Sequence, residues 1–489
     1  MRKAFALFLI CILSISGFAR FAVHSLAAPT EAVTFSETVL YGDPSAAKGL
    51  TVDRNVQFND HLLWSSNIDF REDGYYSQTD FTCSAKTLTS RFGSQNSSNI
   101  GLEMFNNYPD EYRVDGADAD NVHGLQKAKL ELIEETAPGT TGEKTVRIAD
   151  YMDEYLFNIN INLPDLIYGY FPDIYDMDAS SNPEATVIQT IQKYFTIPVL
   201  EDEYYHIGID KDFDGNVIGE FGGSAELGDS FPMYTQSVVA DDAIYFCFDN
   251  RTSNGARVDT SRIPDGYGIY VLPYGSRIKD GKKYQDVFAE DLHTIYPLDP
   301  QTDILTLSLS SDQKTLHLHT VENGTYSVTF IDIATGEARQ KLALADYSLE
   351  ADDFQVFTRE NYAVIRISHS FYVLAEKPDD SWELVFRTTP KSIELEPDYL
   401  PLSSWLEPSI SFDGEKLAVC GHASVTGTTD DSIWRDYGCG FYAAIYDADG
   451  LQYYGLYDSS LQQTYLSDPP WYGYNLHPFE LNDGNVQWN

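Results

Sequence analysis

The stretch that most constrains the fold is residues 303–344, which read as four consecutive β-strands. Leu305, Leu307 and Leu309 alternate with polar residues, and this is the period of a strand with one buried face. A second alternating segment ends at Asn323-Gly324, a dipeptide that favours a type I′ hairpin turn because it tolerates positive φ at both central positions. These residues therefore predict a four-stranded antiparallel sheet.

The order of these strands and turns resembles the blades of bacterial TolB-like and WD40-like β-propellers. The resemblance rests on the turns at Ser311 to Lys314 and at Thr335 to Glu337, and on a partial copy that begins at Ser409. It implies an all-β fold with a single propeller of roughly seven four-stranded blades over residues 50–489. Propellers carry unrelated functions, so the resemblance implies no activity.

Two further segments bear on the architecture. Pro183 suits the first position of a helix, and Val187, Ile188 and Ile191 recur at helical spacing, so one short inserted helix is expected near 181–196. Residues 128–135 and 144–151 are expected to form the two strands of a hairpin. A strand at the C-terminus, within residues 477–489, is expected to complete a sheet that begins near the other end of the chain.

The N-terminus has the pattern of an export signal. Arg2 and Lys3 precede an apolar run from Ala4 to Ala19, and Ser25-Leu26-Ala27 is a small-x-small cleavage site. Residues 1–28 are therefore expected to be a signal peptide or an uncleaved N-terminal anchor, and residues 29–49 a linker. Either reading places the protein outside the cell or in the cell envelope.

The charge of the chain limits its partners. There are 75 acidic residues against 32 lysines and arginines, which gives a formal net charge of −43. Such a surface repels phosphate backbones and anionic lipid. We therefore expect no nucleic acid, membrane contact only through an uncleaved N-terminal segment, and a protein or glycan as partner at the propeller face.

The sharpest local motif is Asp210-Lys211-Asp212-Phe213-Asp214-Gly215. Carboxylates at positions one, three and five with glycine at six match the opening of a calcium-binding loop. The acidic residue expected at position twelve is replaced by Phe221, and a solvated hairpin turn rich in aspartate explains the same residues. Calcium is the one cofactor that the sequence suggests.

Three other candidates are weaker. His317 and His319 point to the same face of a strand, as two metal ligands or as part of a polar strand face. Cys420 and Cys439 lie on consecutive strands, where they form a disulfide or remain buried free thiols. Trp471 lies in a segment that does not read as a strand, where it is a candidate ligand contact.

No catalytic motif stands out. The sequence lacks a Gly-x-Ser-x-Gly elbow and a His-Glu-x-x-His motif. The first hypothesis is therefore an exported binding or scaffold module without catalytic residues. The alternative is a propeller enzyme, a glycan hydrolase or lyase, that uses acidic residues at the central mouth, such as the pairs Asp241-Asp242, Asp352-Asp353 and Asp430-Asp431.

Overall fold

The structure is a computed structural model. It describes Ser14, Gly17 and residues 33–58, 62–83, 101–106, 124–163, 166–170, 183–224, 228–279, 282–349, 354–359, 361–368, 370–388, 408–423, 440–460 and 486–489.

Antiparallel sheets dominate these residues, and we number six of them along the chain. Sheet 1 contains, in spatial order, β28 (Val486–Trp488), β2 (Leu50–Phe58), β3 (Leu62–Arg71) and β4 (Gly74–Cys83). Sheet 2 contains β5 (Gly101–Asn106), β7 (Phe157–Leu163) and β8 (Leu166–Tyr170). Sheet 3 contains β11 (Thr235–Val239), β12 (Ala243–Phe248), β13 (Gly268–Lys279) and β14 (Lys282–Val287), with β15 (His293–Pro297) also paired to β13.

The second half of the chain, together with β1, forms the other three. Sheet 4 contains β16 (Asp303–Leu309), β17 (Thr315–Glu322), β18 (Thr325–Asp332) and β19 (Ala338–Asp346). Sheet 5 contains β20 (Phe354–Thr358), β21 (Tyr362–Ile367), β22 (Ser370–Glu376) and β23 (Trp382–Arg387). Sheet 6 contains β1 (Phe35–Gly42), β27 (Gly450–Ser459), β26 (Gly440–Asp447), β25 (Leu417–Ala423) and β24 (Ser409–Phe412).

Sheet 4 confirms the expectation of four consecutive antiparallel strands. Its strand β17 is buried on both faces, and alternation divides its side chains between two neighbours. Leu316 and Leu318 join the hydrophobic core shared with sheets 2 and 3, whereas Val321 joins the core shared with sheet 5. Sheet 4 therefore packs between sheets 3 and 5, as one blade of a propeller packs between its neighbours.

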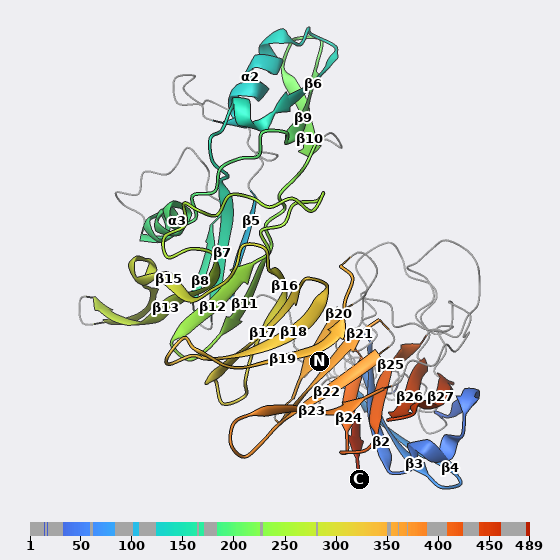
Figure 1. The fold of residues 1–489 in the computed structure, drawn as a ribbon. Coiled ribbons are helices and arrows are strands. Elements are labelled where there is room, and N and C mark those ends of the chain that lie inside the picture. The colour runs from blue at the N-terminus through green and yellow to red at the C-terminus, as the bar shows by residue number, and fades with distance from the viewer. Residues whose placement is uncertain are drawn as a thin grey trace, which may run out of the picture.

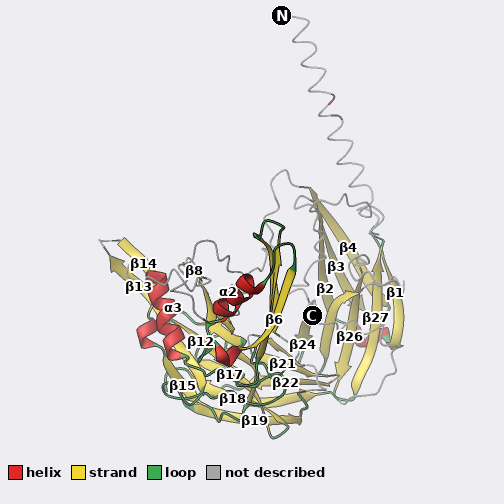
Figure 2. Cartoon of the chain, turned by 90° about the horizontal axis from the view of Figure 1, so that it is seen from above, coloured by secondary structure: helices red, strands yellow, loops and turns green. Residues whose placement is uncertain are grey.

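The hydrophobic cores give the order of the sheets. One core joins sheets 2, 3 and 4, and further cores join sheet 4 to 5, sheet 5 to 6 and sheet 6 to 1. Figure 2 shows these sheets following one another around an arc. Among the described residues, no core joins sheet 1 to sheet 2. The chain is therefore mostly β with repeated four-stranded sheets, and the described residues give six sheets in the arc where seven blades were expected.

Both ends of the chain are paired with strands far away in sequence. The C-terminal strand β28 pairs with β2, with Val486 opposite Val52, as expected for a terminal strand that completes a distant sheet. At the other end, β1 pairs with β27, with Phe35 opposite Ser459. Residues 29–49, expected to be a linker, therefore contribute a strand to sheet 6.

A further sheet stands away from the arc at the top of Figure 1, and we call it the projecting sheet. It contains β10 (Val217–Ser224), β9 (Tyr204–Lys211) and β6 (Thr141–Arg147), in that spatial order. Its strands come from two excursions of the chain, one between β5 and β7 and one between β8 and β11. The hairpin turn that the sequence analysis considered for Asp210 to Gly215 connects β9 with β10, which pair antiparallel.

The structure contains two α-helices among its described residues, where one was expected. The expected helix is α3 (Pro183–Tyr194). The other, α2 (Leu125–Glu135), occupies residues that were expected to form a strand, and that expectation was wrong. Leu125, Ala128 and Leu132 are buried at the spacing of one helix face. This period was hidden because the segment also alternates over a few residues.

The leader falls outside this description except for Ser14 and Gly17, so its cleavage stays a prediction. Within the described ranges, no helix has the length and apolar character needed to cross a membrane.

Candidate functional site

A pocket of about 590 Å³ lies at the junction of sheets 3 and 4. Its wall comes from residues 232–236, which lead into β11, from the loop 249–255 that follows β12, and from Ile304 and Leu349 beside sheet 4. β11 and β16 are the first strands of sheets 3 and 4. The pocket lies beside the residues at which these two strands begin. Its size is typical of small-molecule sites.

Asp229 holds two of these segments together. Its carboxylate is buried and accepts hydrogen bonds from the hydroxyl groups of Thr252 (2.7 Å) and Ser253 (3.2 Å) and from the backbone N–H of Asn254 (3.0 Å). The loop that follows β12 is thereby tied to the segment that enters β11. The pocket wall is therefore fixed by hydrogen bonds before any ligand arrives.

A cluster of four charged side chains lies beside the pocket, and two of them, Asp249 and Arg251, line it. Arg257 pairs through Nη1 with Oδ1 of Asp249 (3.0 Å) and through Nη2 with Asp303. Arg251 lies close to the same two carboxylates, with its Nε 3.5 Å from Asp249 and 3.7 Å from Asp303. Burial raises the pKa of Asp249, and the positive charges of Arg257 and Arg251 oppose that rise. The cluster is neutral as a whole.

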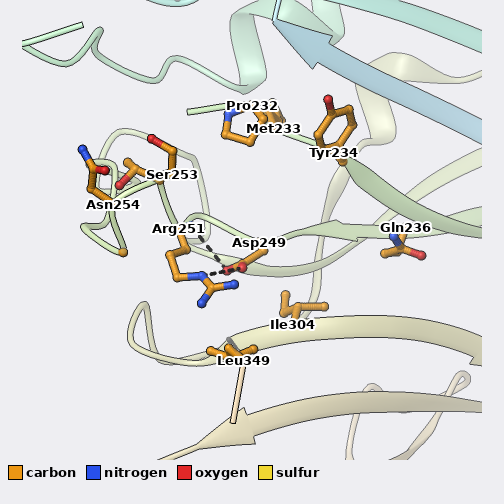
Figure 3. A pocket seen from close by; sticks show the side chains of 12 residues that line it. Pro232, Met233, Tyr234, Gln236, Asp249, Arg251, Ser253, Asn254, Ile304 and Leu349 are labelled. Atoms are coloured by element: carbon orange, nitrogen blue, oxygen red, sulfur yellow. Dashed lines mark hydrogen bonds and ion pairs between the residues drawn. The ribbon is translucent and has the colours of Figure 1, made fainter. Parts of the chain in front are cut away.

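Arg251 is the member of this cluster that lines the pocket together with Asp249, as Figure 3 shows. Its Nε takes part in the ion pairs, while its two terminal nitrogens make no hydrogen bond to any residue within the described ranges. A guanidinium carries five N–H donors. Arg251 therefore presents unused donors to whatever occupies the pocket.

The rim carries an exposed aromatic ring beside a strained residue. Tyr234 is 69% exposed, although it is large and partly apolar. The preceding residue, Met233, has a φ of +38° and a buried side chain. Residues other than glycine rarely adopt such an angle, and strain of this kind concentrates at functional sites. The backbone is therefore held in an unfavourable conformation at the point where Tyr234 is presented.

The three aspartates of the expected calcium loop lie elsewhere, on the hairpin of β9 and β10. Asp212 accepts hydrogen bonds from the backbone N–H groups of Asp214 (2.9 Å) and Asn216 (2.8 Å), and Asp210 accepts one from the Thr141 hydroxyl (2.5 Å). These bonds are what a solvated hairpin turn requires. In the described part of the chain, no group of three or more His, Cys, Asp or Glu side chains could hold a metal ion. Calcium stays a prediction.

His317 and His319 point together into the packed interface between sheets 4 and 5. The ring of His317 makes edge contacts with Trp382 (4.7 Å between centroids) and Phe330 (4.9 Å). Nδ1 of His319 hydrogen-bonds the Tyr326 hydroxyl (2.7 Å). The Nε2 atoms of both histidines have no hydrogen-bond partner among the described residues. Their surroundings are aromatic, so they form a buried aromatic cluster.

The remaining sequence candidates are partly outside the described residues. Trp471 and Cys439 both lie there. Cys420 is buried and forms no disulfide with a cysteine in the described ranges, and burial raises the pKa of its thiol. Its neighbour across the strand pair is Ala443. The pairing of Cys420 with Cys439 and the role of Trp471 therefore stay predictions.

The pocket itself was not found from the sequence. One signal was present: Arg251 and Arg257 lie six positions apart in a strongly acidic chain, directly after a buried strand that ends at Phe248. In the sequence, that loop reads only as a polar segment between two strands. Its partners, Asp229 and Asp303, come from other parts of the sequence, and no local pattern links them.

Comparison with known proteins adds little. No protein-family model matches the chain, and no curated protein matches it. The β-propeller domain of Cps50 (Swd1) from Myceliophteria thermophila is 11% identical, with 51% of this chain and 69% of that chain covered and a TM-score of 0.24. A candidate 6-phosphogluconolactonase from Bacteroides fragilis is 10% identical, with 84% and 95% covered and a TM-score of 0.27.

Oligogalacturonate lyase in complex with manganese is 12% identical, with 87% of this chain and 96% of that chain covered and a TM-score of 0.27. These solved structures include enzymes as well as a β-propeller domain. Scores this low carry no argument about the activity or ligands of this chain, so the function must be argued from its own residues.

Proposed function

We propose that this chain is an exported β-propeller that acts as a binding module, and that the pocket between sheets 3 and 4 takes a segment of a glycan. The observation that carries the proposal is the exposed ring of Tyr234 above a wall of fixed polar groups. An aromatic face receives the C–H face of a sugar ring, and polar groups around it fix the orientation.

The polar groups of the pocket suit hydroxyl groups. Gln236 and Asn254 carry amides that both donate and accept, Ser253 carries a hydroxyl, and Arg251 offers N–H donors. Asp229 holds the loop that bears three of these groups, so little conformational entropy is lost when a ligand binds. The pocket therefore combines one aromatic face with several groups that both donate and accept hydrogen bonds. Neutral sugars require this combination.

The charges of the pocket favour binding over cleavage. Glycoside hydrolysis uses two carboxyl groups that flank the scissile bond, one of them free to act as an acid or base. Here Asp249 and Asp303 share the same two arginines, and Asp303 does not line the pocket. Both carboxylates already form ion pairs with arginine side chains. The alternative of a glycan hydrolase or lyase therefore gains no support from this pocket.

The setting of the protein follows from its sequence. The leader pattern supports export to the cell envelope or the extracellular space, where glycans are abundant, and the net charge of −43 argues against nucleic acid. Membrane contact is proposed only through an uncleaved N-terminal segment.

A glycan array followed by calorimetry on its best ligand tests the proposal. Tyr234→Ala and Arg251→Gln should each weaken binding at least about tenfold, since a stacked ring or a charged hydrogen bond contributes about 1.4 kcal/mol or more. Tyr76→Ala, which removes an exposed tyrosine from sheet 1, is the matched control and should bind as the wild type does. Binding unchanged by Tyr234→Ala, or release of cleaved products, would overturn it.

A further inference from the structure

Exposed apolar side chains gather on one hairpin of this protein. Nine large hydrophobic residues are strongly exposed within the described ranges, and four of them belong to β9, β10 and their connecting turn. These four are Phe213, Val217, Ile218 and Phe221. Phe213 is 92% exposed and Ile218 is 69% exposed. An acidic, water-facing hairpin has no folding reason to carry so many apolar groups, and such patches mark interaction sites.

Hydrogen bonds hold the backbone of the hairpin turn that carries Phe213. The carboxylate of Asp212 accepts hydrogen bonds from the backbone and the side-chain amide of Asn216 (2.8 and 2.9 Å). The backbone carbonyl of Asp212 also accepts a hydrogen bond from Gly139 (2.7 Å), which ties the turn to the neighbouring loop. The Phe213 ring lies so close over Gly139 that a Cβ there would meet it at 2.7 Å. Because the turn backbone is already held, little backbone entropy is lost when Phe213 docks against a partner.

Strand β10 is also an open edge. In the described part of the chain it pairs with β9 alone, while β6 closes the opposite side of β9. Three of its eight residues, Gly219, Gly222 and Gly223, carry no side chain that would hinder the approach of another backbone. An unpaired edge presents a row of N–H and C=O groups that an extended peptide can extend by one strand.

The charges around the hairpin determine what can dock there. Nearby lysines are turned inward: Lys129 pairs with Glu220, Lys144 pairs with Glu131 (3.1 Å), and Lys211 donates to the carbonyl of Thr136 at the end of α2 (2.9 Å). Asp210 near the end of β9 and Asp212 and Asp214 in the turn add three carboxylates. The outward face is therefore apolar and negative. This combination repels anionic lipid and a second copy of the same hairpin, and it attracts a basic segment.

We propose that the β9–β10 hairpin is a docking edge for an extended segment of a partner protein in which apolar and basic residues alternate. The segment adds to β10 as a further strand, its apolar side chains pack against Phe213 and Ile218, and its basic side chains meet the aspartates of the turn. This surface is separate from the pocket between sheets 3 and 4. The proposal of peptide docking is therefore independent of the proposal of glycan binding.

The probe is a capped octapeptide of alternating lysine and valine, measured by fluorescence anisotropy at physiological salt. It should bind the wild type, and the double variant Phe213→Ser with Ile218→Ser should bind it at least tenfold more weakly. The matched control is Leu384→Ser with Val385→Ser, which removes two exposed apolar residues from the edge strand β23 and should change nothing. All four side chains are exposed, so the variants should melt as the wild type does.

Three further measurements distinguish this proposal from simpler explanations. Peptide binding should slow hydrogen exchange of the amides of Val217 to Ser224 and leave those of β23 unchanged. An octapeptide of lysine and serine that binds equally well would show charge attraction alone, and would overturn the proposal. Equal binding of the peptide by the double variant would overturn the proposal, as would equal binding of a peptide of glutamate and valine by the wild type. Binding of the protein to phosphatidylglycerol vesicles through this hairpin would also overturn it.

Discussion

The two buried histidines of sheet 4 predict a loss of stability in mild acid. Burial lowers the pKa of His317 to about 4, partly offset by the charge of Asp312, and burial together with the charge of His317 lowers the pKa of His319 to about 3. In the unfolded chain both should titrate near pH 6.5. Between the folded and unfolded pKa values the unfolded state binds more protons, so acid favours unfolding.

The magnitude follows from these values. At pH 5 an unfolded histidine is almost fully protonated, whereas His317 in the folded protein is protonated in about one molecule in ten. Proton binding at pH 5 therefore shifts the equilibrium towards the unfolded state by a factor of about 30. This factor corresponds to a loss of roughly 2 kcal/mol of unfolding free energy for each histidine. The contribution of each neutral, buried histidine to the unfolding free energy is fully present above about pH 6.5. It declines as the pH falls through that value towards 4.

The perturbation is His317→Phe, which keeps an aromatic ring between Phe330 and Trp382 and removes the titrating nitrogen. Urea unfolding, followed by tryptophan fluorescence, is measured at pH 7.5 and pH 5. The variant should lose roughly 2 kcal/mol less than the wild type between these two conditions. His293→Gln removes an exposed histidine and should follow the wild type. The reasoning is refuted if wild type and His317→Phe lose stability in parallel.

Three more outcomes are expected. Arg257→Ala leaves two partly buried carboxylates short of a cation and should lower the unfolding free energy by roughly 2 kcal/mol, whereas Arg262→Ala breaks an exposed pair and should change it little; urea titration measures both. Gly42→Ala should cost roughly 2 kcal/mol or more, because φ is +74° and the new Cβ would lie 1.8 Å from a carbonyl oxygen of β27; Gly255→Ala, at φ +85° in open space, should cost less. A melting midpoint several degrees higher in calcium than in EDTA, with the difference lost in Asp212→Ala, would confirm calcium binding, and equal midpoints would contradict it.

The local parts of the fold were predictable because their signals are local. Alternation and the Asn323-Gly324 turn predict sheet 4, since both act over a few residues. Pro183 marks the start of α3 for the same reason. Helix α2 was missed because residues 128–135 fit both periods, and only the burial of Leu125 on the same face as Leu132 decides between them.

The candidate site was not predictable, because its residues meet only in three dimensions. Asp229 contacts Asn254 across 25 positions, and Arg257 contacts Asp303 across 46. The sequence contains each charge and says nothing of its partner. The exposure of Tyr234 and the strained backbone of Met233 are likewise properties of the packed structure.

The pairing of the terminal strands with distant sheets was only partly predictable from the sequence. The C-terminal strand was expected to pair with a distant sheet because an isolated strand needs a partner edge. The structure adds what makes that edge specific: Val486 enters the core between sheets 1 and 6, and Trp488 donates from Nε1 to the Ser411 carbonyl (3.2 Å) in sheet 6 while Lys416 lies over its ring (5.7 Å). A strand of three residues thus pairs with sheet 1 and contacts sheet 6. The pairing of β28 with β2, such as Val486 opposite Val52, spans most of the chain length, so we infer that the joint between sheets 1 and 6 forms late in folding, after hairpins such as those of sheet 4.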